Sequence, residues 1–583
     1  MMTLRLLIII AAFALPLLLI TTARAKDWKF KNEFFPLLIQ QVPEILARQN
    51  TQTGKFGTGI WIVREQEAMF PLAVAWASER EDNPYFHDAK LIEAIMLAGD
   101  ALADDQDKTG QWTFRKEDGS TWGQIYMPWT YSKWIQTYAL IKDAMPPGRR
   151  EKWKNALTLG FEGISKNELD HVHNIPAHQA RGLYCAGLAL ERPEWCAQAK
   201  AFMKKVCEAQ DPAGFWSENI GPVVGYNFVY TDSLGVYYAM SKDKTVLPAL
   251  ERAAKYHASF TYPDGTSVET IDERMVYSDA VVMPDVGFSF TPVGCGYAQA
   301  QWKRKQAANS SFSADGAASY YLYGEEDEAI PAPALQDEAV FVLGENDAMT
   351  RRVKPWFACL SAYHAPVPPG RWIQDRQNLV SIYHDEVGVI LGGGNTKLQP
   401  LWSTLTVGNV SLLKHTPGDE NPKFAPPPGI LHVPSEATLD PDATTLRLDY
   451  GDVKTHVSAE LLPQSATITY GINSKTDERV EAHVPLLPGI GKAWATASGK
   501  SGLLSDEAIT LNAGEAGAWV QLDRLRVTLP ADAEITWPVL PHAQYRKDGR
   551  AEPKEGRFVI TLPLSNEAPT REIVLQIIPD AHP

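Results

Sequence analysis

The hydrophobic pattern of the chain changes once, between about residues 324 and 340, and this change constrains the fold more than any other feature. Before it, apolar residues recur at spacings of three and four, as on one face of an α-helix. Short turns with Gly or Pro separate these stretches, which predicts antiparallel helical hairpins. No tetratricopeptide or ankyrin signature is present, so an incomplete (α/α) toroid is favoured over an open solenoid. The helical stretches are Ala89–Ala103, Tyr131–Ala144, Glu151–Ser165, Pro176–Ala189, Trp195–Ala209, Phe228–Met240 and Thr245–Phe260.

A charged, proline-containing linker follows the helical part, and the pattern beyond it is typical of β-strands. Many short apolar or alternating segments with turn residues between them predict an antiparallel β-sandwich. The chain should therefore be a multidomain α-then-β protein, with a toroid over residues 26–328 and a β-sandwich over residues 329–583. The clearest strand segments are Val340–Leu343, Leu379–His384, Val387–Leu391, Thr467–Tyr470 and Ala518–Leu522.

Residues 1–25 have the pattern of a signal peptide. Arg5 precedes an apolar stretch from Leu6 to Ile20, and Ala23-Arg24-Ala25 offers a small-x-small cleavage site. The apolar stretch is about 15 residues long, whereas a membrane-spanning helix needs roughly 20. We expect a periplasmic or secreted protein without stable membrane insertion, and a retained N-terminal anchor is the alternative.

The composition excludes some classes of partner and site. The net charge is −15 and there is no long basic run, which argues against nucleic acid. Five cysteines are too few for a disulfide scaffold, although one bridge among Cys185, Cys196 and Cys207 is conceivable in an oxidising compartment. No cofactor is required by any motif, and a structural divalent metal has no support. The 17 Trp and 21 Tyr residues favour carbohydrate contact, because sugar rings stack on aromatic surfaces.

Three polar clusters in the helical half are candidates for chemistry, and the first lies at residues 170–181. It combines His173, Asn174, His178 and Arg181 at the start of a helix, where Pro176 fits the first turn. His178 and Arg181 are three residues apart and so share a helical face. The alternatives to a catalytic or substrate-binding role are a capping Asn174 with histidines in the core, or metal binding by an H-x-H pair.

The second cluster is the Gly- and aromatic-rich loop at residues 214–222, which leads into another helix. Trp216 and Glu218 lie in the loop, and Tyr226 and Tyr230 lie four residues apart on one face of the helix. Loops at one end of a rigid scaffold often carry function. Packing of large rings in the core is the alternative.

The third cluster runs from Tyr262 to Tyr277 and begins with a Pro-Asp-Gly turn. Arg274 could grip a carboxylate in a bidentate fork, or instead pair internally with Asp272 or Glu269. Further candidates for substrate binding are Tyr277 here and three aromatic residues of an upstream loop, Trp122, Trp129 and Tyr131.

These clusters resemble the polysaccharide lyases that combine an α/α toroid with an antiparallel β-sheet domain, such as the heparinase II/III-like and the alginate and glucuronan lyases. The similar motifs are Asn174 with His178, the W-S-E-N-x-G-P loop with its tyrosines, and Y-P-D-G-x-x-x-E-x-x-D-E-R at residues 262–274. Many members have an Asn-Asn-His-like run, whereas Ile-Pro-Ala separates Asn174 from His178 here.

The resemblance implies β-elimination on an anionic, uronic-acid-containing polysaccharide. Asn174 and Arg274 would neutralise the substrate carboxylate, and His178 would be the base or the partner of a tyrosine base. Tyr226 or Tyr230 would be the acid, and Glu218 would orient a histidine or arginine.

Two other functions compete with this interpretation. A toroid glycoside hydrolase would use paired carboxylates, for which Glu218, Asp232, Asp264 and Glu269 are available. A non-catalytic glycan-binding protein would need the aromatic residues alone, because fold does not fix function.

Overall fold

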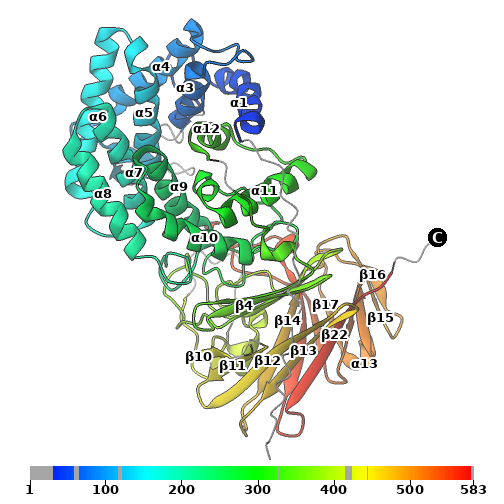
Figure 1. Cartoon of the computed structure of the whole chain (residues 1–583). Coiled ribbons are helices and arrows are strands. Elements are labelled where there is room, and N and C mark those ends of the chain that lie inside the picture. Colours follow the sequence, from blue (N-terminus) through cyan, green and yellow to red (C-terminus); the bar gives the residue numbers. More distant parts are fainter. Residues whose placement is uncertain are drawn as a thin grey trace, which may run out of the picture.

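The computed structural model describes residues 30–57, 65–115, 121–325, 328–413, 423–440, 442 and 444–579. A largely helical domain is followed by a domain of antiparallel sheets (Figure 1). The predicted order of an α toroid and then a β-sandwich is confirmed. The predicted signal peptide, residues 1–25, lies outside the described residues.

The toroid is a ring of paired helices. Helices α3, α5, α7 and α9 pack against one another in succession, and α12 returns to contact α1 and α3. A second set, α4, α6, α8 and α10, connects them. Bounds are α1 Phe30–Ala47, α3 Met69–Ala77, α4 Ala89–Asp105, α5 Pro128–Ile141, α6 Pro147–Asn167, α7 Asn174–Ala189, α8 Pro193–Glu208, α9 Val224–Ser241, α10 Leu247–Ser259, α11 Pro292–Ala307 and α12 Ala314–Tyr323.

The two helix sets differ in their patterns because they differ in their surroundings. Helix α5 is buried on nearly all sides and carries apolar or small residues at most positions. Helix α8 buries a single stripe that includes Trp195, Phe202 and Val206, with charged residues on its other face. A helix that is apolar on all sides must be surrounded by other elements. An amphipathic helix packs its apolar face on such an inner helix and exposes its polar face to solvent. A short hairpin, β1 Trp112–Arg115 and β2 Thr121–Ile125, also belongs to this domain.

The second domain has two antiparallel sheets. The first contains eleven strands and the second nine. The first sheet consists of β3 Glu338–Leu343, β4 Ala348–Val353, β5 Trp356–Ser361, β6 Val380–His384, β7 Gly388–Leu391, β8 Leu405–Gly408, β9 Ile430–Leu431, β14 Val480–Leu486, β17 Ile509–Asn512, β20 Glu534–Val539 and β21 Arg557–Leu564. The second consists of β10 Glu436–Leu439, β11 Thr445–Tyr450, β12 Val453–Leu462, β13 Ser465–Ile472, β15 Ala493–Thr496, β16 Ser501–Leu503, β18 Trp519–Leu522, β19 Leu525–Thr528 and β22 Thr570–Ile577.

Burial along the strands shows which sheet faces the toroid. Strand β12 alternates between buried and more exposed residues, so one face of the second sheet meets solvent. Strands β5 and β6 are buried at every position. Phe357 and Tyr383 from these strands pack with Phe260 and Tyr262 of the helical domain. The first sheet therefore lies between the second sheet and the toroid.

The segment from Tyr262 to Tyr277 belongs to the helical domain and packs against the β domain. Its Pro-Asp-Gly turn forms as predicted: Gly265 has φ +94°, and its amide donates to the Tyr262 carbonyl at 2.9 Å. Glu269 is buried and accepts from the Gly393 amide of the first sheet at 2.8 Å. Gly393 has φ +88°, and a Cβ there would collide with the Arg557 guanidinium, so only glycine fits this contact.

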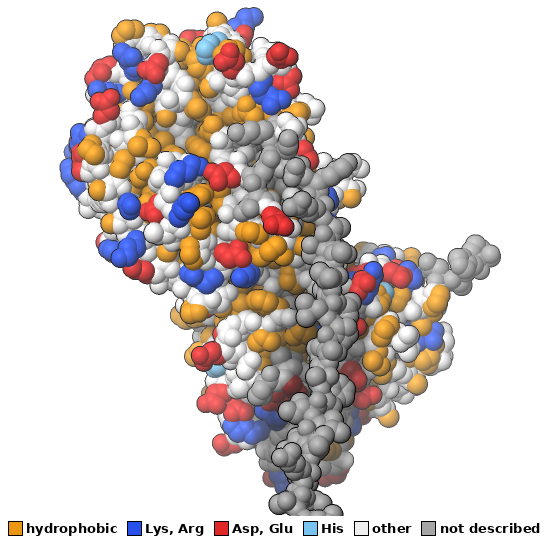
Figure 2. Space-filling view, in the orientation of Figure 1, with side chains coloured by type: hydrophobic (Ala, Val, Ile, Leu, Met, Phe, Trp, Pro, Cys, Tyr) orange, Lys and Arg blue, Asp and Glu red, His pale blue; other side chains and the backbone are white. Residues whose placement is uncertain are grey.

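Three further observations concern the described part of the chain. All five cysteines are free thiols, so the conceivable bridge among Cys185, Cys196 and Cys207 is absent. Among the described residues, no helix combines the length and apolar character needed to cross a membrane. Acidic and basic side chains are interspersed over the visible face of the toroid (Figure 2).

Candidate active site

The start of helix α7 holds the first part of the candidate site. Asn174 is the first residue of the helix, and its amide nitrogen lies 3.0 Å from both carboxylate oxygens of Glu218. His173 Nε2 lies 3.2 Å from Glu218 Oε1, and this interaction raises the pKa of His173. Glu218 therefore fixes the orientation of both neighbours. The helix N-cap is His173, so the alternative of Asn174 as a cap does not hold.

The second part of the site is the pair formed by Tyr226 and Arg274. Arg274 Nη1 donates to the Tyr226 hydroxyl at 2.8 Å, and its guanidinium carbon lies 4.9 Å from the centre of the tyrosine ring. Burial raises the pKa of Tyr226, and the positive charge of Arg274 opposes that rise. The alternative of an internal salt bridge is not observed among the described residues, because Asp272 and Glu269 have other partners. The buried Nε of Arg274 has no hydrogen-bond partner in this part of the chain.

Asp272 explains why Tyr226 and Arg274 lie side by side. One of its carboxylate oxygens accepts from the Val224 amide at 2.8 Å, at the start of helix α9, and the other accepts from the Arg274 amide at 2.7 Å. The free amides at a helix N-terminus favour such an acceptor. A single carboxylate thus joins the helix that carries Tyr226 to the segment that carries Arg274.

The loop that carries Glu218 connects the first part to the second. The Ile220 amide of this loop donates to Glu273 Oε2 at 2.8 Å, and the Glu273 amide donates to the Pro222 carbonyl at 3.3 Å, next to Arg274. Five of the predicted residues therefore form one polar cluster, in which Asn174 is buried and the other four are partly exposed. We call it the α7–α9 site: His173, Asn174, Glu218, Tyr226 and Arg274.

Tyr230 and Trp216 lie deeper than this cluster. Their rings are stacked with centroids 4.8 Å apart and planes 9° apart, and both residues are buried. Burial raises the pKa of Tyr230 well above the ordinary value. These two residues form a supporting wall of the core, so the predicted acid role of Tyr230 and the substrate contact of Trp216 do not fit their positions.

His178 and Arg181 belong to a separate buried charge cluster. His178 is 2% exposed, and its Nε2 lies 3.3 Å from Asp232 Oδ2, which also accepts from Arg181 Nη1. Burial, with the nearby Arg181 charge, lowers the pKa of His178 to about 3. A buried imidazole facing an internal ion pair does not reach substrate, so His178 as base and Arg181 as substrate ligand are not retained.

The remaining aromatic candidates lie in three different settings. Tyr131 is fully buried and donates to the Gly110 carbonyl, so it is a core residue and not a substrate platform. Trp129 is half-buried with its ring 5.3 Å from that of His178. Trp122 is 71% exposed and stacks on Phe114 in the β1–β2 hairpin. Tyr277 packs edge-to-face on Tyr262 at the domain junction.

The carboxylates of the hydrolase alternative are all engaged internally. Glu269 accepts from Gly393 and Tyr262, and Asp264 accepts from the amide and hydroxyl of Thr266. Asp232 is occupied by Arg181 and Glu218 by Asn174. The geometry therefore offers no acid–base pair of carboxylates within this set. Nor do the described residues contain a group of three His, Cys, Asp or Glu side chains placed to hold a metal ion.

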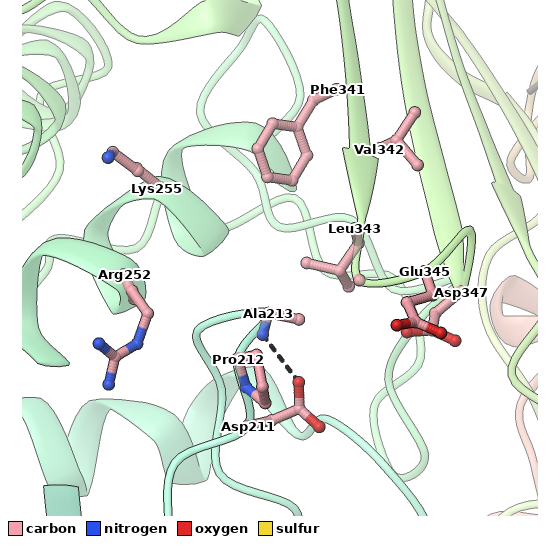
Figure 3. A pocket seen from close by; sticks show the side chains of 11 residues that line it. Asp211, Pro212, Ala213, Arg252, Lys255, Phe341, Val342, Leu343, Glu345 and Asp347 are labelled. Atoms are coloured by element: carbon pink, nitrogen blue, oxygen red, sulfur yellow. Dashed lines mark hydrogen bonds between the residues drawn. The ribbon is translucent and has the colours of Figure 1, made fainter.

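A cavity of about 590 Å³ lies elsewhere at the domain junction (Figure 3). Arg252 and Lys255 of α10 lie across it from Glu345 and Asp347 of the β3–β4 hairpin. Burial, together with the neighbouring carboxylates, raises the pKa of Asp347. None of the predicted site residues lines this cavity, so it is distinct from the α7–α9 site.

Sequence reasoning missed two kinds of residue near the site. Asp272 was considered as a partner for Arg274, but its role at the start of helix α9 requires knowing which helix lies beside it. Trp372 and Tyr545 of the β domain lie in segments with no helical or strand pattern. Long-range contacts place them near Arg274, and no local signal in the sequence could have found them.

Comparison with known proteins identifies the class of the helical domain. Residues 57–275 match the family model of the ulvan lyase N-terminal domain. The matched range contains every residue of the α7–α9 site. A search of curated proteins found no match.

Solved structures show the same fold over nearly the whole chain. The chondroitin AC lyase of Streptomyces coelicolor A3, in complex with chondroitin sulphate, is 13% identical with a TM-score of 0.54, and the alignment covers 96% of this chain and 81% of that one. A chondroitinase AC lyase studied as oligosaccharide complexes is 11% identical with a TM-score of 0.50, covering 95% and 83%. The predicted fold, a toroid followed by a β domain, is thereby confirmed, and the helical domain is similar to the N-terminal domain of ulvan lyases.

Proposed function

We propose that this polysaccharide lyase is exported and cleaves a uronic-acid-containing polysaccharide by β-elimination, with Tyr226 exchanging protons with the substrate. The observation that carries the proposal is the Arg274–Tyr226 hydrogen bond of 2.8 Å beside the Asn174–Glu218–His173 group. The N-terminal pattern of residues 1–25 supports export.

The chemistry needs two functions that this cluster can supply. The C5 proton of a uronate is weakly acidic until the charge of its carboxylate is neutralised, and the Arg274 guanidinium supplies a positive charge beside Tyr226 for that purpose. A base must then take the C5 proton. Tyr226 is placed to do so: burial raises its pKa, and the adjacent Arg274 charge opposes that rise and so lowers the cost of forming the phenolate.

The electron pair released at C5 forms the C4=C5 double bond, and the C4–O bond breaks. The departing oxygen stays on the neighbouring sugar and takes a proton from the Tyr226 hydroxyl, so the enzyme returns to its starting state. His173, with its raised pKa, adds a donor toward the substrate carboxylate, and the Asn174 amide holds Glu218 in place beside it.

The test is the ultraviolet absorbance of the conjugated double bond during incubation with a panel of uronic-acid polymers. The panel would contain alginate, glucuronan, pectic, ulvan-type and glycosaminoglycan substrates. A rising signal that Tyr226→Phe abolishes and Tyr230→Phe retains is the expected result. New reducing ends without absorbance would instead indicate hydrolysis and overturn the proposal.

A further inference from the structure

The β domain presents two large exposed rings beside the α7–α9 site. Trp372 is 45% exposed and Tyr545 is 66% exposed, and their ring centroids are 5.8 Å apart. They come from different segments, one between β5 and β6 and the other between β20 and β21. Two adjacent exposed rings from distant parts of the chain form a small apolar patch of the kind that marks a binding surface.

Two hydrogen bonds place this pair next to Arg274. Gln544 Nε2 donates to the Arg274 carbonyl at 2.8 Å, and Tyr545 is the next residue. The Gln374 amide donates to the Glu273 carbonyl at 2.9 Å, and Trp372 is two residues earlier.

The loop that carries Trp372 is held at both ends. Buried Lys397 donates through Nζ to the Pro368 carbonyl at 2.6 Å and to Asp375 Oδ1 at 3.0 Å. Gln374 Nε2 also donates to the Arg371 carbonyl at 3.1 Å. A loop closed by a buried lysine presents its exposed tip in a fixed orientation, which lowers the entropy lost on binding.

A positive charge adjoins the rings. The Arg371 guanidinium carbon lies 4.5 Å from the centre of the Trp372 ring, and Arg371 forms no ion pair with another described residue. An aromatic face with an adjacent cation suits a sugar ring that bears an anionic group.

We propose that Arg371, Trp372 and Tyr545, here called the β-domain wall, form a subsite for a sugar next to the one that is cleaved. The rings stack on that sugar, and Arg371 binds a carboxylate or sulfate that it carries. This inference rests on the proposed function and names residues that select the substrate.

The test compares wall variants with a matched pair on the second sheet. Trp519 and Arg526 have the same indole–guanidinium geometry, 4.5 Å, on β18 and β19. We expect Trp372→Ala to raise KM roughly tenfold, and Tyr545→Ala by a smaller factor, with kcat changed less than about twofold. Trp519→Ala and Arg526→Gln should leave both constants unchanged.

Polymer binding, measured by calorimetry in a Tyr226→Phe background, separates the wall from the chemistry. Loss of binding in Trp372→Ala supports the wall, whether or not the polymer is cleaved. Absence of cleavage with this loss of binding would refute the proposed function but not the wall. Unchanged KM and unchanged binding in Trp372→Ala and Tyr545→Ala overturn the wall.

Matched sulfated and desulfated polymers identify the anionic group. Arg371→Gln should weaken binding to a degree that shrinks as salt is raised. Weaker binding of both polymers indicates a carboxylate, and weaker binding of the sulfated polymer alone indicates a sulfate. No effect on either polymer overturns the role of Arg371.

Discussion

The first and second turns of helices α7 and α9 carry the same kinds of residue but differ in what those residues can do. Asn174 and Tyr226 lie in the first turns, and His178 and Tyr230 follow four residues later. One helical turn advances about 5.4 Å along the axis. Over that distance α9 passes from the partly exposed Tyr226 to the buried Tyr230, whereas Asn174 and His178 on α7 are both buried and differ in their partners.

The difference lies in partners and in protonation. Tyr226 contacts the Arg274 cation, whereas Tyr230 stacks on Trp216. Burial keeps His178 neutral by lowering its pKa to about 3, whereas Glu218 raises the pKa of His173. Residue type and spacing are therefore poor guides to catalysis unless depth is also known.

The largest difference should appear when the hydroxyl groups of Tyr226 and Tyr230 are removed one at a time. Tyr226→Phe should lower kcat by about 10²–10⁴-fold, because it deletes the proton-exchanging group while keeping the ring. Tyr230→Phe should keep nearly full activity. Steady-state rates of the two variants on the responding polymer make the comparison, and equal losses would erase the distinction between the turns.

Next in size is the loss of the buried ion pair at the second turn. Asp232→Asn leaves the guanidinium of Arg181 buried and unpaired, so we expect destabilisation of about 3 kcal/mol. Chemical denaturation measures it. Activity per folded molecule should remain, and a variant that is stable but inactive would show that the buried cluster takes part in catalysis.

Acid should lower the free energy of unfolding of the protein through His178, in the second turn of α7. His178 has a pKa of about 3 in the folded protein and an ordinary value of 6.5 when unfolded, so the unfolded chain binds the extra proton between these values. Stability therefore falls as the pH falls below 6.5, by roughly 2.5–3 kcal/mol for this histidine at pH 4.5.

Urea unfolding of wild type and His178→Gln across this pH range tests the contribution. The variant should show a shallower fall. Since the pKa of His173 is raised, His173→Gln should have the opposite sign, removing stability that is present at low pH and lost as the pH rises. Identical slopes in all three proteins would contradict the assignment.

The smallest expected change concerns the first turn alone. Glu218→Gln removes the charge that raises the pKa of His173, so that pKa should return toward its ordinary value. We expect roughly a tenfold lower kcat/KM, about 1.4 kcal/mol, because Asn174 is also held less firmly. NMR titration of His173 provides the readout, and an unchanged pKa would show that Glu218 does not control it.

Most of the architecture follows from periodicity. The predicted helix Trp195–Ala209 and the observed α8, Pro193–Glu208, differ by at most two residues, because α8 has a clean amphipathic stripe. The strands around β6 and β7 follow equally from their apolar runs. Fold-level prediction succeeded because these signals are local.

Within the site, the residues that depend on local pattern were found and those that depend on packing were not. Asn174, Tyr226 and Arg274 stand in recognisable motifs. The depth of His178 is set by Asp232, which lies 54 positions along the chain and approaches only when α7 and α9 pack together. Trp372 lies near the site because Gln374 contacts Glu273. These two residues are far apart in the sequence, so no local pattern predicts their contact.

The contact between Glu269 and Gly393 has a consequence for how such a protein can evolve. The helical domain packs directly on the β domain at this contact. Glu269 accepts from the Gly393 amide, and Arg557 of β21 donates to the Gly393 carbonyl. Recombination that replaced either half would have to bring a matching partner for the other. We therefore expect that exchange of either domain alone would break this contact, whereas point substitutions in loops such as the one that bears Trp372 would leave it intact.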